Sequence, residues 1–114
     1  MKEGTRKKIG SRDSKVVSEF KRKVTEAFPE AEIILYGSKA RGEGGEFSDL
    51  DLLVILDGVV NTSIEDRIYD LGYELELKHG VILGILVQSR KFWDSDLARA
   101  MPLRWNIDRE GVKI

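Results

Sequence analysis

The chain contains no cysteine, a single histidine, two prolines and no long run of apolar residues. Without cysteine it has no disulfide bonds, thiolate metal sites or cysteine nucleophiles, and this composition favours an intracellular, cytoplasmic location. One histidine leaves little material for zinc hydrolase or catalytic-triad chemistry. No segment approaches the roughly 20 apolar residues that a membrane-spanning helix needs, so we expect no membrane partner.

An excess of charge of one sign is also lacking, because 19 Lys and Arg residues face 20 Asp and Glu residues, for a net charge of −1. A general nucleic-acid-binding surface would show a marked basic excess, so we do not expect duplex DNA or RNA as a partner. The 114 residues, 41% of them hydrophobic, suit one domain spanning residues 1–114. Lys and Arg gather in residues 1–12, which we expect to form a flexible basic tail.

The apolar run Ile33–Tyr36 predicts a strand that ends abruptly at Gly37. Glycine lets the backbone turn there, and we expect Ser38 to cap a short helix. The Ser38 hydroxyl and the neighbouring backbone N–H groups should then point outward. Phosphate oxygens suit such a turn. Arg41, or Lys39, is a candidate for a charge-assisted contact to the same oxygens, although exposed cations near glycine loops are more often solvated.

A second apolar run, residues 50–56, predicts a buried strand that opens with two carboxylates. Asp49 and Asp51 lie two positions apart, so their side chains project to the same side of the strand. Two carboxylates held this close repel each other unless a cation lies between them, and a hard divalent ion such as Mg²⁺ favours that arrangement. The pair therefore predicts a metal site, and Ser48 directly before it is a further candidate for contact with phosphate.

Periodic apolar residues predict two longer helices. The first follows the polar residues 11–14 and ends before Pro29. The second opens with a capping box at Thr62 and Glu65 and ends at Gly80.

The C-terminal third predicts a short last helix that Pro102 ends. Residues 106–114 then form a tail that adds a strand or packs on an edge. We expect Trp93, Trp105 and Tyr73 in core or edge packing, because no basic residues interleave with them as in a base-stacking surface.

The order of these elements predicts an α/β (α+β) domain with a small mixed sheet of three to four strands and helices packed on it. If the glycine turn ends the first strand and the aspartates begin the second, these two strands run antiparallel. A right-handed helical crossover then makes the second and third strands parallel. Both motifs should meet at one edge of the sheet.

Each motif alone has an ordinary explanation, since a Gly-Ser turn is a common loop and Ser-Asp-x-Asp is a common helix cap or strand entry. Together, between two apolar strands, they favour a nucleotide and metal site. The arrangement of Gly37-Ser38, ten residues and Asp49-x-Asp51 resembles the signature of the DNA polymerase beta-type nucleotidyltransferase superfamily. It is most similar to the minimal nucleotidyltransferase domains of that superfamily, which implies their fold.

The resemblance implies Mg²⁺-dependent transfer of a nucleoside monophosphate, with AMP from ATP as the leading choice, to a hydroxyl of a protein, RNA end or small molecule. The turn at Gly37 and Ser38, Arg41 and Ser48 would hold phosphate. Asp49 and Asp51 would hold the metal and act in catalysis. Minimal nucleotidyltransferases frequently act as the antitoxin beside a small helical HEPN toxin, which implies such a partner. The exposed edges of a small sheet also leave a homodimer open.

The third carboxylate that the superfamily normally takes from the next strand is missing. Residues 81–87 are expected to form that strand, and none of them is acidic. Without this group an incoming hydroxyl lacks a proton acceptor, and only one of the usual two metal positions is well furnished. We expect solvated helix positions for Glu74, Glu76 and His79 and assign none of them as catalytic. An alternative function is therefore a catalytically impaired module that binds nucleotide or a partner.

Overall fold

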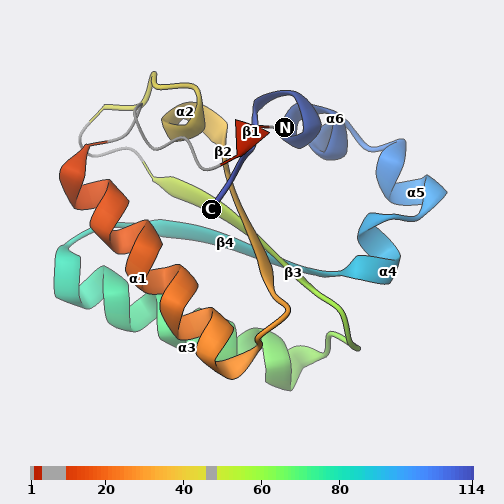
Figure 1. Ribbon diagram of the computed structural model, residues 1–114, viewed down its shortest axis with the longest axis horizontal. Coiled ribbons are helices and arrows are strands. Elements are labelled where there is room, and N and C mark those ends of the chain that lie inside the picture. The colour runs from red at the N-terminus through yellow and green to blue at the C-terminus, as the bar shows by residue number, and fades with distance from the viewer. Residues whose placement is uncertain (1, 4–9, 46–48) are drawn as a thin grey trace.

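The computed structural model describes residues 2–3, 10–45 and 49–114, folded around one mixed sheet (Figure 1). Five strands lie in the order β1-β5-β2-β3-β4. Their bounds are β1 (Lys2–Glu3), β2 (Glu32–Tyr36), β3 (Leu50–Leu56), β4 (Leu83–Ser89) and β5 (Val112–Lys113). The helices are α1 (Ser11–Ala27), α2 (Gly37–Ala40), α3 (Thr62–His79), α4 (Arg90–Trp93), α5 (Asp96–Arg99) and α6 (Pro102–Glu110). The predicted α/β fold is confirmed, and the two-residue strands β1 and β5 widen the expected sheet to five strands.

The three long strands bring their backbones together around one residue. β2 runs antiparallel to β3, with Tyr36 paired opposite Asp51. β4 runs parallel to β3, with Gly84 paired opposite Asp51. Both predicted strand directions are confirmed, and the turn after β2 meets the start of β3 at one edge of the sheet.

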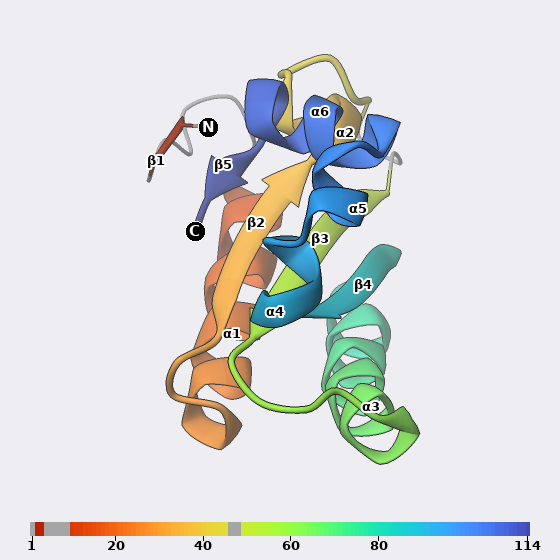
Figure 2. The ribbon, with the colours of Figure 1, turned by 90° about the vertical axis from the view of Figure 1, so that its right-hand side faces the viewer.

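Helices cover both faces of the sheet (Figure 2). α1 and α3 pack on one face, where they form the larger apolar core with the strands. On the other face Trp93 of α4 and Ile107 of α6 pack with Leu53 in a smaller core. Because side chains alternate along β3, Asp51 projects to the same face as Leu53. Within the described ranges, none of the helices has the length and apolar character needed to cross a bilayer.

Several element boundaries differ from the prediction. The cap of α3 is Asn61, whose Oδ1 accepts a 2.9 Å hydrogen bond from the N–H of Ile64, so the capping box predicted at Thr62 is wrong. Pro102 begins α6 instead of ending a helix, which suits a residue without an N–H group at the first helical position. The tail predicted over residues 106–114 is wrong up to Glu110, which belongs to α6, but its end does add a strand, since Val112–Lys113 pairs with β2.

The N-terminal end departs from the predicted basic tail of residues 1–12. Lys2–Glu3 pairs with β5 as strand β1, and α1 already begins at Ser11. The rest of the predicted tail, apart from Gly10, lies outside the described residues.

The aromatic residues expected in core or edge packing divide into two groups. Trp93 is buried, and the guanidinium of Arg104 lies 4.9 Å from the centre of its ring. Trp105 and Tyr73 are 69% and 59% exposed, so the prediction is wrong for these two. Both lie on solvent-facing sides of helices.

A buried ion pair joins α1 to α2. Lys39 Nζ donates a 2.7 Å hydrogen bond to Asp13 Oδ2, and both residues are 6% exposed. Removing one partner of such a pair leaves a charge away from water without compensation. The side chain of Lys39 is therefore directed at α1, and the phosphate contact considered for it from the sequence would have to break this bond.

Asp13→Ala should destabilise the protein by about 3–5 kcal/mol, because the Lys39 ammonium stays buried without its partner. Denaturant unfolding followed by circular dichroism measures the change in free energy. The double variant Asp13→Leu, Lys39→Met removes both charges and should recover most of the loss. Equal losses in the single and double variants would show that packing, and not charge, decides the outcome.

Candidate functional site

The carboxylate of Asp51 lies in a slot between two glycines. A Cβ atom placed on Gly37 would lie 2.4 Å from Asp51 Oδ2, and one placed on Gly84 would lie 2.7 Å from Asp51 Oδ1. Real Cβ atoms essentially never come within 3.0 Å of another heavy atom, so a larger residue at either position must displace this carboxylate. The backbones of β4 and of the turn after β2 therefore flank Asp51 on two sides.

The turn after β2 is tight and depends on its glycine. Gly37 has a φ of +77°, which L side chains rarely adopt. Ser38 lies inside the four-residue α2, whose N-cap is Tyr36 without a side-chain hydrogen bond, so the predicted capping role of Ser38 is wrong. The Ser38 carbonyl instead accepts the N–H groups of Glu43 and Gly44 at 3.0 and 3.3 Å. These bonds fold the following loop back onto the turn.

The two aspartates differ in exposure and act on one another. Asp49 is exposed just before β3, whereas Asp51 is partly buried. Burial raises the pKa of Asp51, and the negative charge of Asp49 raises it further. Across the strand pair, burial and then the charge of Asp51 raise the pKa of Tyr36. The ionised form of Asp51 is therefore disfavoured in this structure.

This donor set fits a hard divalent ion. Mg²⁺ prefers oxygen ligands and usually keeps water and substrate phosphate beside one or two protein carboxylates. A cation beside Asp49 and Asp51 would relieve the repulsion that raises the pKa of Asp51. Among the described residues, no group of three or more acidic or histidine side chains is placed to hold a metal ion. In the part of the chain that the structure describes, Asp49 and Asp51 are thus the protein ligands that nucleotide and water would complete.

Arg41 and Ser48 complete the set of phosphate contacts predicted from the sequence. Arg41 Nε donates to Glu43 Oε2 and Arg41 Nη1 donates to Glu110 Oε2, both at 2.9 Å. These carboxylates hold the guanidinium between α2 and α6 and occupy two of its five N–H donors, so a phosphate there would share Arg41 with them. Ser48 lies outside the described residues.

Gly84 lies beside Asp51, on the strand that the resemblance led us to expect as the source of a third carboxylate. The two residues are paired across parallel strands, and paired residues project to the same face of a sheet. Glu76, the nearest acid before β4 in the chain, uses its Oε2 to accept the N–H of Leu83 at 2.8 Å. It therefore caps the start of β4, consistent with leaving it out of the catalytic set.

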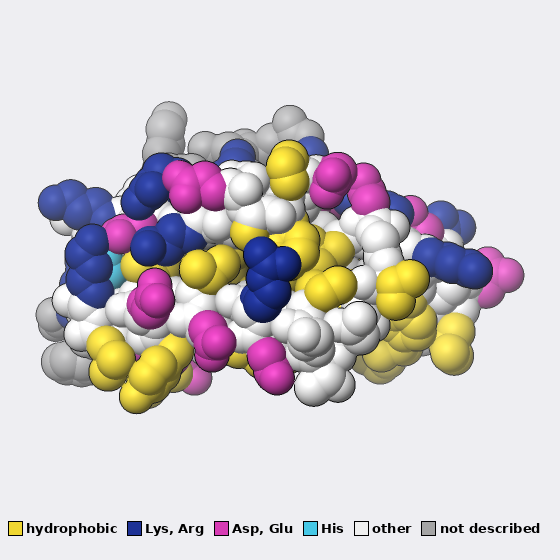
Figure 3. All heavy atoms as spheres, turned by 90° about the horizontal axis from the view of Figure 1, so that it is seen from below, with side chains coloured by type: hydrophobic (Ala, Val, Ile, Leu, Met, Phe, Trp, Pro, Cys, Tyr) yellow, Lys and Arg dark blue, Asp and Glu magenta, His cyan; other side chains and the backbone are white. Residues whose placement is uncertain are grey.

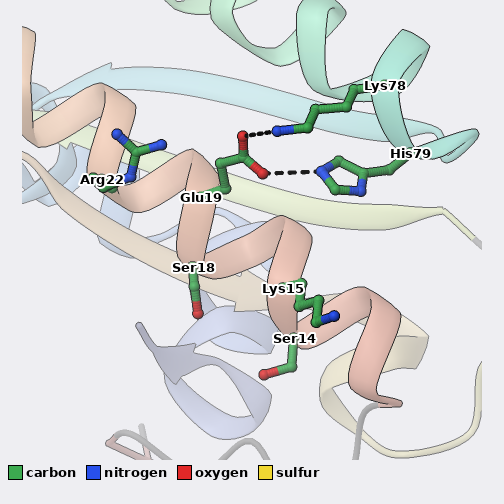
Figure 4. A pocket seen from close by; sticks show the side chains of 7 residues that line it. All are labelled: Ser14, Lys15, Ser18, Glu19, Arg22, Lys78 and His79. Carbon is green, nitrogen blue, oxygen red and sulfur yellow. Dashed lines mark hydrogen bonds and ion pairs between the residues drawn. The ribbon is translucent and has the colours of Figure 1, made fainter.

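A separate cavity of about 560 Å³ lies between α1 and α3 (Figure 4). Glu19 of α1 points to the end of α3, where it accepts a 2.7 Å bond from Lys78 Nζ and lies 2.9 Å from His79 Nε2. The hydrogen bonds from Lys78 and then from His79 lower the pKa of Glu19 to about 2. The described lining includes no residue of β3 or of the turn after β2. His79 therefore joins two helices and does not belong to the aspartate site.

Two parts of this site escaped sequence reasoning. An isolated glycine inside an apolar strand signals the close approach of another group, and Gly84 carries that signal. In residues 81–87 the absence of an acidic residue is the more obvious signal, and it draws attention away from the glycine. The bond between Arg41 and Glu110 joins residues 69 positions apart, so no local pattern predicts it.

Gly84→Ala and Gly37→Ala should both displace the Asp51 carboxylate, whereas Gly58→Ala, with no heavy atom within 4 Å of its added Cβ, is the control. Gly84→Ala should cost about 1 kcal/mol, because the short side chain of Asp51 can rotate away. Gly37→Ala should cost about 1–2 kcal/mol more, because alanine resists a positive φ. Denaturant unfolding measures both costs, and the carboxyl carbon resonance of Asp51 reports the displacement. An unchanged Asp51 resonance in Gly84→Ala would contradict the slot.

Asp51→Asn should raise the melting temperature at pH 7, because it removes a charge that burial and Asp49 disfavour. The folded-state pKa of Asp51 lies above its ordinary value of 3.8, so the wild type gains stability as pH falls through the folded-state pKa. The difference in melting temperature between the wild type and Asp51→Asn should vanish at pH values below the ordinary pKa of 3.8. Calorimetric melting across this pH range tests the prediction, with the exposed Glu30→Gln as control. A wild type more stable than Asp51→Asn at pH 7 would contradict it.

One known protein is similar over part of the sequence. It comes from Methanocaldococcus jannaschii, carries the provisional name of a protein adenylyltransferase, and is 38% identical over 65 residues. These residues are 57% of this chain and 60% of that protein. The match therefore spans less than two thirds of that relative's length.

Two solved structures share the fold. A chain in a mutant form of the toxin-antitoxin MntA-HpeT has a TM-score of 0.56 at 14% identity, covering 90% of this chain and 70% of that one. A chain in a toxin-antitoxin structure with AMP-PNP has a TM-score of 0.57 at 14% identity, covering 91% and 72%. The family model described as "Nucleotidyltransferase domain" matches residues 17–100, which is most of the sequence. This chain belongs to the nucleotidyltransferase domain family.

Proposed function

We propose that this protein transfers AMP from ATP, in the presence of Mg²⁺, to a hydroxyl acceptor. The observation that carries the proposal is the Asp51 carboxylate, held between Gly37 and Gly84 and next to Asp49, at the edge where the glycine turn ends β2. Family membership and the provisional name of the Methanocaldococcus relative support the same class of reaction.

Each group of residues has its own task in this proposal. Asp49 and Asp51 supply carboxylate oxygens to Mg²⁺, which when bound neutralises charge on the triphosphate. Gly37, Ser38 and Ser48 hold phosphate oxygens, and Arg41 joins them through N–H groups that Glu43 and Glu110 do not use. The acceptor oxygen forms a bond to the α-phosphorus while the bond to the bridging oxygen breaks, the hydroxyl proton passes to solvent water, and pyrophosphate leaves.

The proposed acceptor is a small helical protein, towards which this chain acts as an antitoxin in the cytoplasm. The two structural neighbours are toxin-antitoxin proteins, and one of these structures contains AMP-PNP. In this proposal the partner contributes a tyrosine hydroxyl that receives the AMP. Pairing of two copies through the outer edge of β4, which is the last strand of the sheet, is a separate proposal for a homodimer.

A second candidate function is a module that binds nucleotide or a partner without transfer. Gly84 favours it, because the position beside Asp51 offers no carboxylate to accept a proton from the acceptor hydroxyl. A module that binds nucleotide would still hold Mg²⁺ and ATP beside Asp51 without transferring AMP. A module that binds a partner would form its complex without Mg²⁺ or ATP.

Calorimetric titration should show ATP binding that depends on Mg²⁺ and weakens at least about tenfold in Asp49→Asn, Asp51→Asn, because the variant loses both carboxylate ligands. Asp94→Asn, Asp96→Asn is the matched control, since these residues have the same two-position spacing and lie beyond β4. The control should bind like the wild type. Equal affinity in the wild type and the first variant would contradict the proposed site.

ATP labelled at the α-phosphate separates the enzyme from the binding module. The enzyme should leave the label on an acceptor protein in a cell extract and release pyrophosphate. The module should bind ATP in the calorimeter yet release no pyrophosphate. Asp49→Asn, Asp51→Asn gives the background level in both assays.

A further inference from the structure

Helix α3 carries apolar side chains on two nearly opposite sides. Ile68 and Leu75 on the inner side are fully buried in the larger core. Tyr69, Tyr73 and Leu77 follow one another every four residues on the other side and are 39%, 59% and 68% exposed. We call these three residues the outer stripe. A surface helix is normally polar towards solvent, so a second apolar side indicates a second packing surface.

The outer stripe has the shape of a helix-packing ridge. Side chains four positions apart line one side of a helix, and the stripe from Tyr69 to Leu77 extends about 12 Å along the axis. Such ridges pack into the grooves of another helix. Tyrosine is also enriched at protein interfaces, where its ring packs and its hydroxyl stays hydrogen-bonded. In Figure 3, hydrophobic and acidic side chains lie side by side on the face covered by α1 and α3.

Acidic residues border the outer stripe. Asp66, Asp70 and Glu74 are all exposed. Residues 62–77 contain five acidic side chains and one basic side chain, Arg67. The guanidinium of Arg67 lies 4.9 Å from the ring centre of a phenylalanine at the end of α1. The surface of α3 is therefore apolar along the stripe and negative at its borders.

This charge argues against a second copy of the chain on the stripe. Packing stripe against stripe would bring the acidic residues of one α3 close to those of the other. A partner with positive charge would remove the repulsion.

The outer stripe also lies away from the nucleotide site. α3 packs on the face of the sheet that carries Leu83 and Ile85, whereas Asp51 projects from the other face. A partner on the stripe therefore leaves Asp51 and the turn at Gly37 open.

We propose that the outer stripe is the docking surface for a partner helix that is apolar on one side and has Lys or Arg along the borders of that side. Its apolar side covers Tyr69, Tyr73 and Leu77, and its basic borders face Asp66 and Asp70. The contact does not depend on nucleotide, so it stands or falls separately from the transfer reaction.

The test uses a fluorescent amphipathic peptide helix with leucine on one side and lysine along the borders of that side, and a matched peptide with glutamate in place of lysine. The full chain should bind the leucine-lysine peptide, and Tyr73→Ala, Leu77→Ala should weaken binding about tenfold, because both apolar contacts are lost. Asp66→Asn, Asp70→Asn should weaken it and reduce its dependence on salt. The control Val59→Ala, Leu97→Ala removes two apolar side chains elsewhere that are at least as exposed, and it should bind like the wild type. Fluorescence anisotropy measures each Kd.

Several results would overturn the proposal. Among them are no binding of the leucine-lysine peptide, equal binding of the glutamate peptide, and equal weakening by the control pair. A wild type that sediments as a dimer, and becomes monomeric in Tyr73→Ala, Leu77→Ala, would assign the stripe to a second copy instead. All variants should keep the wild-type circular dichroism spectrum and the wild-type response to ATP, which separates this test from that of the nucleotide site.

Discussion

The space between two glycine backbones fixes the position of the Asp51 carboxylate, and the rest of the site depends on that constraint. Antiparallel pairing with β2 places Gly37 on one side of it, and parallel pairing with β4 places Gly84 on the other. A shift of β3 by one residue would turn Asp51 to the opposite face of the sheet, because side chains alternate along a strand. The register of β3 against β2 and β4 therefore determines whether the carboxylate lies between the two glycines.

The two faces of the sheet have different tasks. α1 and α3 bury the larger core on one face, and the Lys39–Asp13 pair and the Glu19 contacts tie these helices to α2 and to each other. On the other face the smaller core ends short of the aspartates. Stability thus comes mainly from one face, while the charged site, which is disfavoured without a cation, lies on the other.

Local patterns predicted most of the fold and supply the proposed metal ligands. The alternation of side chains favours a common face for Asp49 and Asp51, which stays a prediction, and the crossover rule correctly predicted the parallel pairing of β3 and β4. The roles of Gly84 and Arg41 depend on contacts between distant segments, which local patterns do not contain. Pro102 was misassigned because proline is compatible both with the end of one helix and with the first turn of the next.

Paramagnetic NMR with Mn²⁺ in place of Mg²⁺, in the presence of a non-hydrolysable ATP analogue, tests the central claim most directly. Mn²⁺ prefers the same oxygen ligands and broadens the resonances of nearby amides. The account predicts that the amides of Gly37 and Gly84 broaden, that Gly58 at the far end of β3 does not, and that Asp49→Asn, Asp51→Asn abolishes the effect. Broadening centred on Glu19 and spared at Gly84 would contradict it.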